Sequence, residues 1–169
     1  MSLVLTALKK QFGSSILDAH QFRGDDTVIV ERSSNLEILR FLKEEPQLDF
    51  NVLIDLTAVD YLKTQREPRK FILRGEPRFD VVYHLYSLAK NHRVRVKVPI
   101  AESDCRLRSV VSLWPIANWF EREAWDMFGM HFDGHPHLKR IMMYEEFVGH
   151  PLRKDYPVNK RQPLVGPKN

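Results

Sequence analysis

The stretch 79–99 of this 169-residue sequence reads FDVVYHLYSLAKNHRVRVKVP, and it decides the fold. Two runs, 79–88 and 92–99, flank the short stretch Ala89-Lys90-Asn91, which is typical of a hairpin turn. Successive side chains of a strand point to opposite faces. In the second run three valines alternate with three basic residues, namely Val94, Val96 and Val98 with Arg93, Arg95 and Lys97. The pattern predicts an antiparallel hairpin with one buried and one basic face.

Two further segments predict strands. The stretch 50–61, FNVLIDLTAVDY, is β-branched and largely apolar, which favours a central strand covered on both faces. Asp55 and Asp60 interrupt it, and a buried aspartate requires a partner. Upstream, the runs 16–22 and 27–31 flank Arg-Gly-Asp-Asp, whose glycine and aspartates favour a turn, so they predict a second hairpin.

Helical spacing predicts three helices. The first contains Leu5, Leu8 and Phe12 and stops at Gly13. The second covers about 35–44, where Ser34 and Glu37 have the spacing of a capping box. The third covers about 115–128, with a proline in its first turn and Gly129 as its C-terminal stop. Together the elements predict an α+β fold: a single mixed, mainly antiparallel sheet with helices packed on it, plus an extended C-terminal tail.

Composition divides the chain into an α+β core domain, 1–133, and an extended C-terminal docking tail, 134–169. The tail has seven basic and three acidic residues, so it carries the whole net charge of +4, and it has five of the ten prolines. Without sustained apolar periodicity it should form few regular elements, and we expect it to order against another surface. Truncation near residue 133 should then leave a folded core and abolish assembly. The charged stretch 62–77 is a candidate insertion or partner-contact loop.

Two classes of protein are disfavoured by composition. The single cysteine, Cys105, cannot form an internal disulfide or a cysteine-type cluster site, which suits a reducing compartment. No stretch approaches the roughly 18 apolar residues that a membrane span requires. We therefore expect a soluble chain, or one held to a membrane only through partners.

The helix at 115–128 is the first candidate functional element. Its spacing predicts an apolar face of Ile116, Trp119, Phe120, Ala124 and Met127, and a polar face of Asn118, Glu121, Arg122 and Trp125. A tryptophan among charges on a solvent-side face is typical of an interface anchor. The alternative is that a C-terminal segment folds back over Trp125.

Three carboxylates of this helix, Glu121, Glu123 and Asp126, could serve as general acids or bases. No companion motif supplies a nucleophile or a pocket, so we expect no catalytic residues. Arg122 and Asp126 are four residues apart, and the spacing predicts an ion pair along the helix.

Histidines accumulate in the next segment, namely His131, His135, His137 and His150, with Asp133 nearby. An independent metalloenzyme that uses them with the helix carboxylates is one alternative. The spacing disfavours it, because Gly129, Gly134 and Pro136 interrupt the region. The units Gly-His-Pro at 134–136 and 149–151 favour defined chain kinks instead, with the histidines bonded to neighbouring carbonyls.

A nucleic-acid-binding domain is a further alternative, because Arg93, Arg95 and Lys97 could neutralise phosphates. Aromatic residues are not interleaved with these basic ones as stacking platforms, so we expect no nucleic-acid partner. Glycine-rich phosphate loops and Cys-x-x-Cys pairs are also missing from the sequence, and we expect no cofactor in this chain.

The segments EREAWDMFGMHFDGHPHLKRI, at 121–141, and EFVGHPLRKDYP, at 146–157, resemble the 30 kDa subunit, also called the C subunit, of the proton-pumping NADH–quinone oxidoreductase (respiratory complex I). Within them Asp126-Met127-Phe128-Gly129 and 149–155 follow the family's order and spacing. LIDLTAVDY at 53–61 and the strand pair at 79–98 look similar too, so the resemblance covers about 15–158. The last dozen residues depart from the family.

The resemblance implies a non-catalytic structural and assembly subunit of the peripheral arm, docked on the quinone-site subunit, which is related to hydrogenase large subunits, and near the iron–sulfur subunits. NAD, FMN, iron–sulfur clusters and quinone would belong to those partners, and the chain would lie on the cytoplasmic face of the bacterial inner membrane. An equivalent subunit of a membrane-bound hydrogenase or a ferredoxin–quinone reductase is the alternative. The expected docking residues are Glu121, Arg122, Trp125, Asp126, His135, Arg140, His150, Arg153, Lys154 and Asp155.

Overall fold

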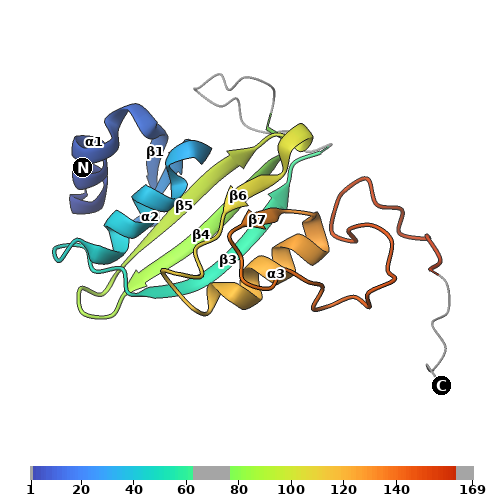
Figure 1. Ribbon diagram of the computed structural model, residues 1–169. Coiled ribbons are helices and arrows are strands. Elements are labelled where there is room, and N and C mark those ends of the chain that lie inside the picture. The colour runs from blue at the N-terminus through green and yellow to red at the C-terminus, as the bar shows by residue number, and fades with distance from the viewer. Residues whose placement is uncertain (1, 63–76, 163–169) are drawn as a thin grey trace.

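The computed structural model describes residues 2–62 and 77–162, and the predicted loop at 62–77 lies almost entirely outside them. Its helices are α1 (Leu3–Phe12), α2 (Asn35–Glu44) and α3 (Ala117–Phe128). Its strands are β1 (Ile16–Phe22), β2 (Asp25–Val30), β3 (Val52–Asp60), β4 (Phe79–Ser87), β5 (His92–Ile100), β6 (Arg106–Arg108) and β7 (His131–Asp133). Five strands form the main sheet in the order β1-β2-β5-β4-β3 (Figure 1).

The predicted hairpin of β4 and β5 is confirmed, and it contributes two of the sheet's three inner strands. The two strands pair antiparallel, with Tyr83 opposite Val96. Val94, Val96 and Val98 are buried as the alternation predicts. β2 runs parallel to β5, whereas the other pairs of this sheet are antiparallel. The sheet is therefore mixed and mainly antiparallel, and the predicted fold class is confirmed.

The predicted central strand at 50–61 is β3, but it lies at the edge of the sheet, so that placement was wrong. Leu53, Leu56 and Ala58 are buried, whereas Ile54 is 48% exposed. The register with β4 shifts between Leu53 and Asp55, which marks a bulge. The bulge interrupts the alternation of buried and exposed side chains along β3. The sequence of this edge strand therefore resembles that of a strand covered on both faces.

The N-terminal elements match the prediction in position. Arg23 and Gly24 join β1 to β2, and both have positive φ, 52° and 89°, which suits a tight hairpin turn. Helix α2 covers the predicted 35–44, but the capping box was wrong. The Ser34 side chain makes no cap hydrogen bond, because its Oγ lies 2.9 Å from Ser15 Oγ instead.

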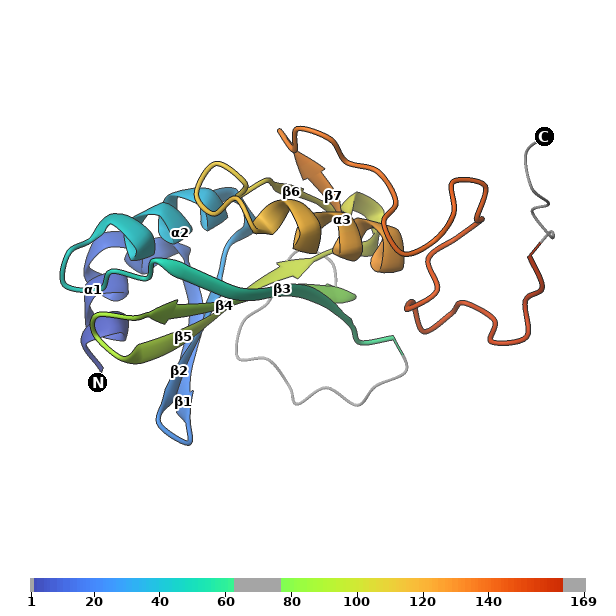
Figure 2. The ribbon, with the colours of Figure 1, turned by 90° about the horizontal axis from the view of Figure 1, so that it is seen from below.

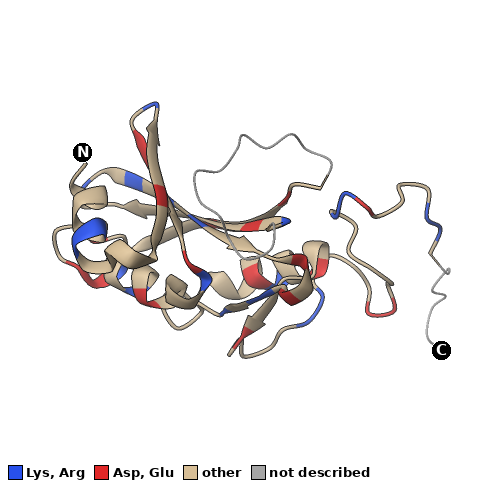
Figure 3. Cartoon of the chain, turned by 90° about the horizontal axis from the view of Figure 1, so that it is seen from above, with Lys and Arg blue, Asp and Glu red and all other residues tan. Residues whose placement is uncertain are grey.

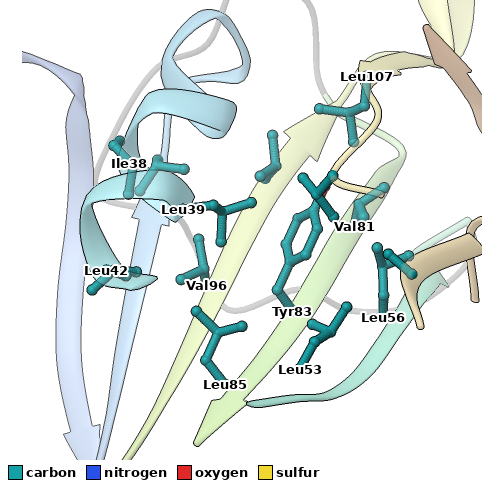
Figure 4. Packing of buried hydrophobic residues seen from close by; sticks show 14 of the residues in the cluster. Ile38, Leu39, Leu42, Leu53, Leu56, Val81, Tyr83, Leu85, Val96 and Leu107 are labelled. Carbon is teal, nitrogen blue, oxygen red and sulfur yellow. The ribbon is translucent and has the colours of Figure 1, made fainter. Parts of the chain in front are cut away.

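Helices α2 and α3 lie side by side on one face of the sheet (Figure 2). The main core lies between these helices and the sheet. In Figure 4, Leu39 of α2 points toward Val96 of β5, and Tyr83 and Leu85 of β4 belong to the same buried cluster. Burial of such side chains provides the main favourable free energy of folding. β6 and β7 form a small parallel pair that the sequence did not predict.

Residues 134–162, called the tail below, contain no helix or strand. The tail continues from β7 past the C-terminal end of α3, at the opposite end of the molecule from α1 (Figures 1 and 2). Figure 3 shows that charged residues occur on both core and tail. No helix in the described ranges is long and apolar enough to cross a membrane.

Candidate functional site

Helix α3 packs on the sheet through a face that only partly matches the predicted one, because Ala124 and Met127 are buried and Phe120 packs partly buried against the core as expected. Ala117, Glu121, Ala124 and Phe128 are buried, whereas Trp119 is 58% exposed and Ile116 is 48% exposed. The two alanines allow close approach of the helix to the sheet. The predicted assignment of Trp119 and Ile116 to the core face, and of Glu121 to the polar face, was therefore wrong.

Glu121 is fully buried because neighbouring groups satisfy its carboxyl group. Ser109 Oγ donates to one oxygen at 2.7 Å, and the Val110 backbone N–H donates to the other at 2.7 Å. Burial raises the pKa of Glu121 to about 7, although these two hydrogen bonds act in the opposite direction. Glu121 therefore links α3 to the segment after β6, and its side chain does not reach the surface.

The first part of the tail runs along α3 in the same direction as the helix. A ring nitrogen of His135 lies 3.2 Å from the Asn118 carbonyl oxygen. One turn further, the Arg122 guanidinium donates to the carbonyl oxygens of Lys139 and Arg140, each at 3.2 Å. The predicted ion pair between Arg122 and Asp126 is absent from these contacts, because each side chain bonds a tail residue instead.

Asp126 is the strongest anchor of the tail. Its side chain is fully buried, and Oδ2 accepts the backbone N–H groups of Ile141, Met142 and Met143 at 3.0, 2.8 and 2.9 Å. Arg140 Nη1 donates to Oδ1 at 2.5 Å. Burial opposes ionisation, but the three amides and the guanidinium outweigh it and lower the pKa of Asp126. The carboxylate thus closes a turn of the tail against the helix.

The C-terminal end of α3 forms a second anchor, because its last carbonyl groups have no partners within the helix. A ring nitrogen of His150 lies 3.0 Å from the Asp126 carbonyl oxygen. The Leu152 N–H donates to the Met127 carbonyl at 3.1 Å, and Arg153 Nε donates to the Phe128 carbonyl at 2.6 Å. A positive side chain is favoured at this end of a helix dipole.

Gly129 allows this approach. It has φ +79°, which ends the helix as predicted, and an added Cβ would lie 2.7 Å from Arg153 Nη2 and 2.8 Å from the His150 ring. A side chain at this position would therefore displace the tail. Gly134 and Gly149 also have positive φ, 82° and 106°, and this confirms the kinks predicted for the two Gly-His-Pro units.

A third anchor joins the tail to the sheet and contains Arg78, a residue that the sequence interpretation left out. Asp60 ends β3, and its partner is Arg78, which precedes β4; their closest atoms are 2.7 Å apart. Asp155 bonds the same guanidinium at 2.7 Å, and the Lys154 N–H donates to Asp60 at 2.8 Å. The need of a buried Asp60 for a partner was predictable, but the identity of that partner was not.

Trp125 is partly covered by the tail. The Arg140 guanidinium lies over its ring at 5.7 Å from the centroid and over the Phe147 ring at 5.6 Å. Phe147 in turn stacks with Tyr156 at 5.9 Å. The alternative in which a C-terminal segment folds back over Trp125 is therefore what the structure shows, and the tail has a small aromatic cluster of its own.

The histidines do not converge on a metal site. Among the described residues, no group of three or more His, Cys, Asp or Glu side chains is placed to hold a metal ion. His135 and His150 bond carbonyl oxygens, as the structural interpretation predicted, and His131 Nδ1 lies 3.2 Å from Asp133. The arrangement favours chain positioning over metal chemistry.

The basic strand face is mixed in charge. Arg93 and Arg95 lie with His84 beside Asp25 and Asp55 in an open depression of about 310 Å³. The Arg93 guanidinium also lies 5.7 Å from the centroid of the Tyr86 ring, and Arg95 Nη1 donates to Thr27 at 3.3 Å. Phosphate binding favours an uninterrupted positive surface, so this face gives the nucleic-acid hypothesis no support.

Apolar side chains remain exposed around the anchored tail. They are Ile116 just before α3, Trp119 on α3, and Met142, Val148 and Leu152 on the tail, each at least 48% exposed. The Arg122 guanidinium lies 5.4 Å from the centroid of the Trp119 ring. We call these five residues the apolar rim. Exposed tryptophan and methionine flanked by arginine are typical of protein–protein interfaces.

Two comparisons concern sequence. The family model described as "Respiratory-chain NADH dehydrogenase, 30 Kd subunit" matches residues 28–162. The NADH-quinone oxidoreductase C subunit of Geobacter sulfurreducens is 47% identical over 161 residues, which cover 94% of this chain and 92% of that protein. The combined C/D subunit of the NADH-quinone oxidoreductase of Azotobacter vinelandii is 44% identical over 158 residues, which cover 91% of this chain and 25% of that protein.

Two solved structures are similar in fold. A trypsin-resistant fragment (1-134) of Nqo5 has a TM-score of 0.66 and 33% sequence identity, and the match covers 80% of this chain and 98% of the fragment. A chain of the membrane-bound sulfane sulfur reductase, an archaeal respiratory membrane complex, has a TM-score of 0.68 at 24% identity, with 93% and 85% covered. The second likeness shows the fold alone. The chain therefore belongs to the family of the 30 kDa subunit of respiratory-chain NADH dehydrogenase.

Proposed function

We propose that this chain is a structural and assembly subunit of the peripheral arm of an NADH–quinone oxidoreductase, and that it docks on the quinone-site subunit through α3 and the tail. The observation that carries the proposal is the apolar rim. Its five side chains are presented by α3 with the residue before it and by the tail, which two anchors hold against the helix and a third joins to the sheet. Such a surface is preorganised, so binding would cost less ordering entropy than binding by a free segment.

The relatives support the choice of complex and of partner. The C subunits of NADH-quinone oxidoreductases match nearly their whole length to this chain. In the combined C/D subunit, the similar region makes up 25% of one longer polypeptide. Fusion of two subunits in one chain favours direct contact between them. We therefore infer that the neighbour is the D subunit, which we take to be the quinone-site subunit.

The ten docking residues expected from the sequence have a different part in this proposal. Most of their polar groups bond the chain itself, as Asp126, His150 and Asp155 do. They would act by holding the tail in place, while the apolar rim makes the contacts. The trypsin-resistant fragment (1-134) of Nqo5 supports a comparable division into a core and a more accessible tail in that relative.

The proposed role is non-catalytic, with NAD, FMN, iron–sulfur clusters and quinone bound by partner subunits. Its support is that the carboxylates of Glu121, Asp126 and Asp155 bond groups of this chain and so hold the fold together. We also propose the cytoplasmic face of the bacterial inner membrane as the location. The chain would be held there by the complex.

Co-purification tests the proposal. A tagged chain should recover the quinone-site subunit from a membrane extract, and Trp119→Ala should reduce recovery, whereas Phe22→Ala should not. Phe22 is 62% exposed on the β1–β2 hairpin and serves as the matched control. Recovery of a hydrogenase or ferredoxin-dependent assembly would favour the alternative complex. A folded chain that recovers no respiratory subunit would refute the proposed function.

A further inference from the structure

Arg78 binds residues from three distant parts of the chain. Its side chain is 6% exposed, and it bonds both oxygens of Asp60, with Nε at 3.0 Å and Nη2 at 2.7 Å. Nη1 also donates to Glu102 at 2.5 Å. The Asp60 side chain is fully buried. A buried, bidentate pair of this kind has a fixed geometry, because any rotation would leave a charge unpaired away from water.

The tail contacts both members of this pair. Asp155 accepts from Nη2 at 2.7 Å and from Nη1 at 3.0 Å, while the Lys154 N–H donates to Asp60 Oδ2 at 2.8 Å. The Arg78 guanidinium therefore binds the side chain of Asp155, and the Asp60 carboxylate binds the backbone of the neighbouring Lys154. Two contacts at neighbouring residues fix both the position and the direction of the chain at this point.

We propose that Asp60 and Arg78 are positioning residues that form a socket for Lys154 and Asp155, and that this socket sets the course of residues 156–162. Its importance for assembly rests on the function proposed above. The segment beyond the socket contains Val158, whose side chain is fully exposed, and basic Lys160. Without the socket, residues 156–162 would have no fixed position relative to α3.

The positioning role of the socket can be tested without removing the buried Asp60–Arg78 pair that stabilises the fold. Asp155 is 48% exposed, whereas Asp60 and Glu102 also bond Arg78 and would remain after Asp155 is changed. Asp155→Asn should therefore weaken the socket and leave the buried pair intact. Asp104→Asn is the matched control, because Asp104 is a 45% exposed carboxylate that pairs with Arg32 at 2.6 Å.

Amide hydrogen exchange of the isolated chain tests the socket directly. The Lys154 amide should be protected in the unchanged chain. Asp155→Asn should accelerate its exchange by up to about fivefold, which is the upper contribution of a half-exposed ion pair to an opening equilibrium. Asp104→Asn should leave the rate unchanged, and the melting temperature should change little in either variant. An unaltered Lys154 rate in Asp155→Asn would overturn the proposal.

Binding of the purified quinone-site subunit tests the consequence. Asp155→Asn should weaken the apparent affinity about threefold or more, because only molecules with the tail in place are competent to bind. Faster exchange with unchanged affinity would overturn the role in assembly. If the unchanged chain failed to bind that partner, the proposed function would be lost, and the exchange rates would still decide whether the socket exists.

Discussion

Replacing Asp126 by asparagine removes the charge at the strongest anchor of the tail. The carboxylate accepts three backbone amides and one guanidinium, and it is fully buried. Asparagine keeps one oxygen acceptor but places an amide donor opposite other donors. Arg140, whose side chain is 13% exposed, would lose its partner.

The expected loss is about 3–5 kcal/mol in the free energy of opening the segment around Ile141 to Met143. This is the range found when one partner of a buried ion pair is removed, and each hydrogen bond to a charged group contributes about 1.5–3 kcal/mol. Because about 1.4 kcal/mol corresponds to a factor of ten, exchange of the three amides should accelerate by about a hundredfold or more.

Hydrogen exchange followed by NMR measures these three amides individually. Glu123→Gln changes an exposed carboxylate of the same helix and should leave their rates unaltered. If exchange in Asp126→Asn rose by less than about tenfold, the carboxylate would not be the anchor that its geometry indicates.

Three further predictions concern the other anchors and the buried acid. Burial acts to raise the pKa of Asp60, but Arg78 and two backbone amides outweigh it and lower that pKa to about 2. The Asp60 carboxylate therefore contributes about 2 kcal/mol of stability above pH 3.8, and this contribution is lost as the pH falls toward 2. The free energy of unfolding, measured as a function of pH, should show this loss in the natural chain but not in Asp60→Asn. For Glu121, burial raises the pKa from 4.5 to about 7, so the sign is reversed. About 3 kcal/mol of stability is lost as the pH rises between these values, and denaturant unfolding of Glu121→Gln should lack this loss. Gly129→Ala places a methyl group 2.7 Å from Arg153 at a positive φ, so it should destabilise the chain by about 1–3 kcal/mol and increase tryptic cleavage of the tail; unchanged cleavage would contradict the second anchor.

Local patterns predicted the elements well. The alternation in 92–99 correctly predicted β5, and helical spacing placed α2 correctly, because both patterns are local signals. Gly129 ended α3 as expected, because a left-handed residue after a helix favours glycine. These features depend on residues only a few positions apart.

Features that depend on long-range partners were missed. Glu121 was assigned to solvent because its spacing says nothing of Ser109 and Val110, whose groups make burial possible. Arg78 bonds Asp155, which is 77 residues away in sequence. Likewise, the tail lacks helical or strand periodicity. It is held by individual polar contacts to α3 and β3, which join residues far apart in the sequence. Periodicity cannot detect such contacts.

We propose that α3 and the anchored tail together face the quinone-site subunit. Site-specific photocrosslinking in the assembled complex tests it most directly, with the reactive group placed at Trp119, at Met142 and, as a control, at Phe22. All three positions are about 60% exposed, so the probe is equally accessible in the free chain. We predict crosslinks to the quinone-site subunit from Trp119 and Met142 but not from Phe22. Crosslinks to that partner from Phe22 alone would contradict the account.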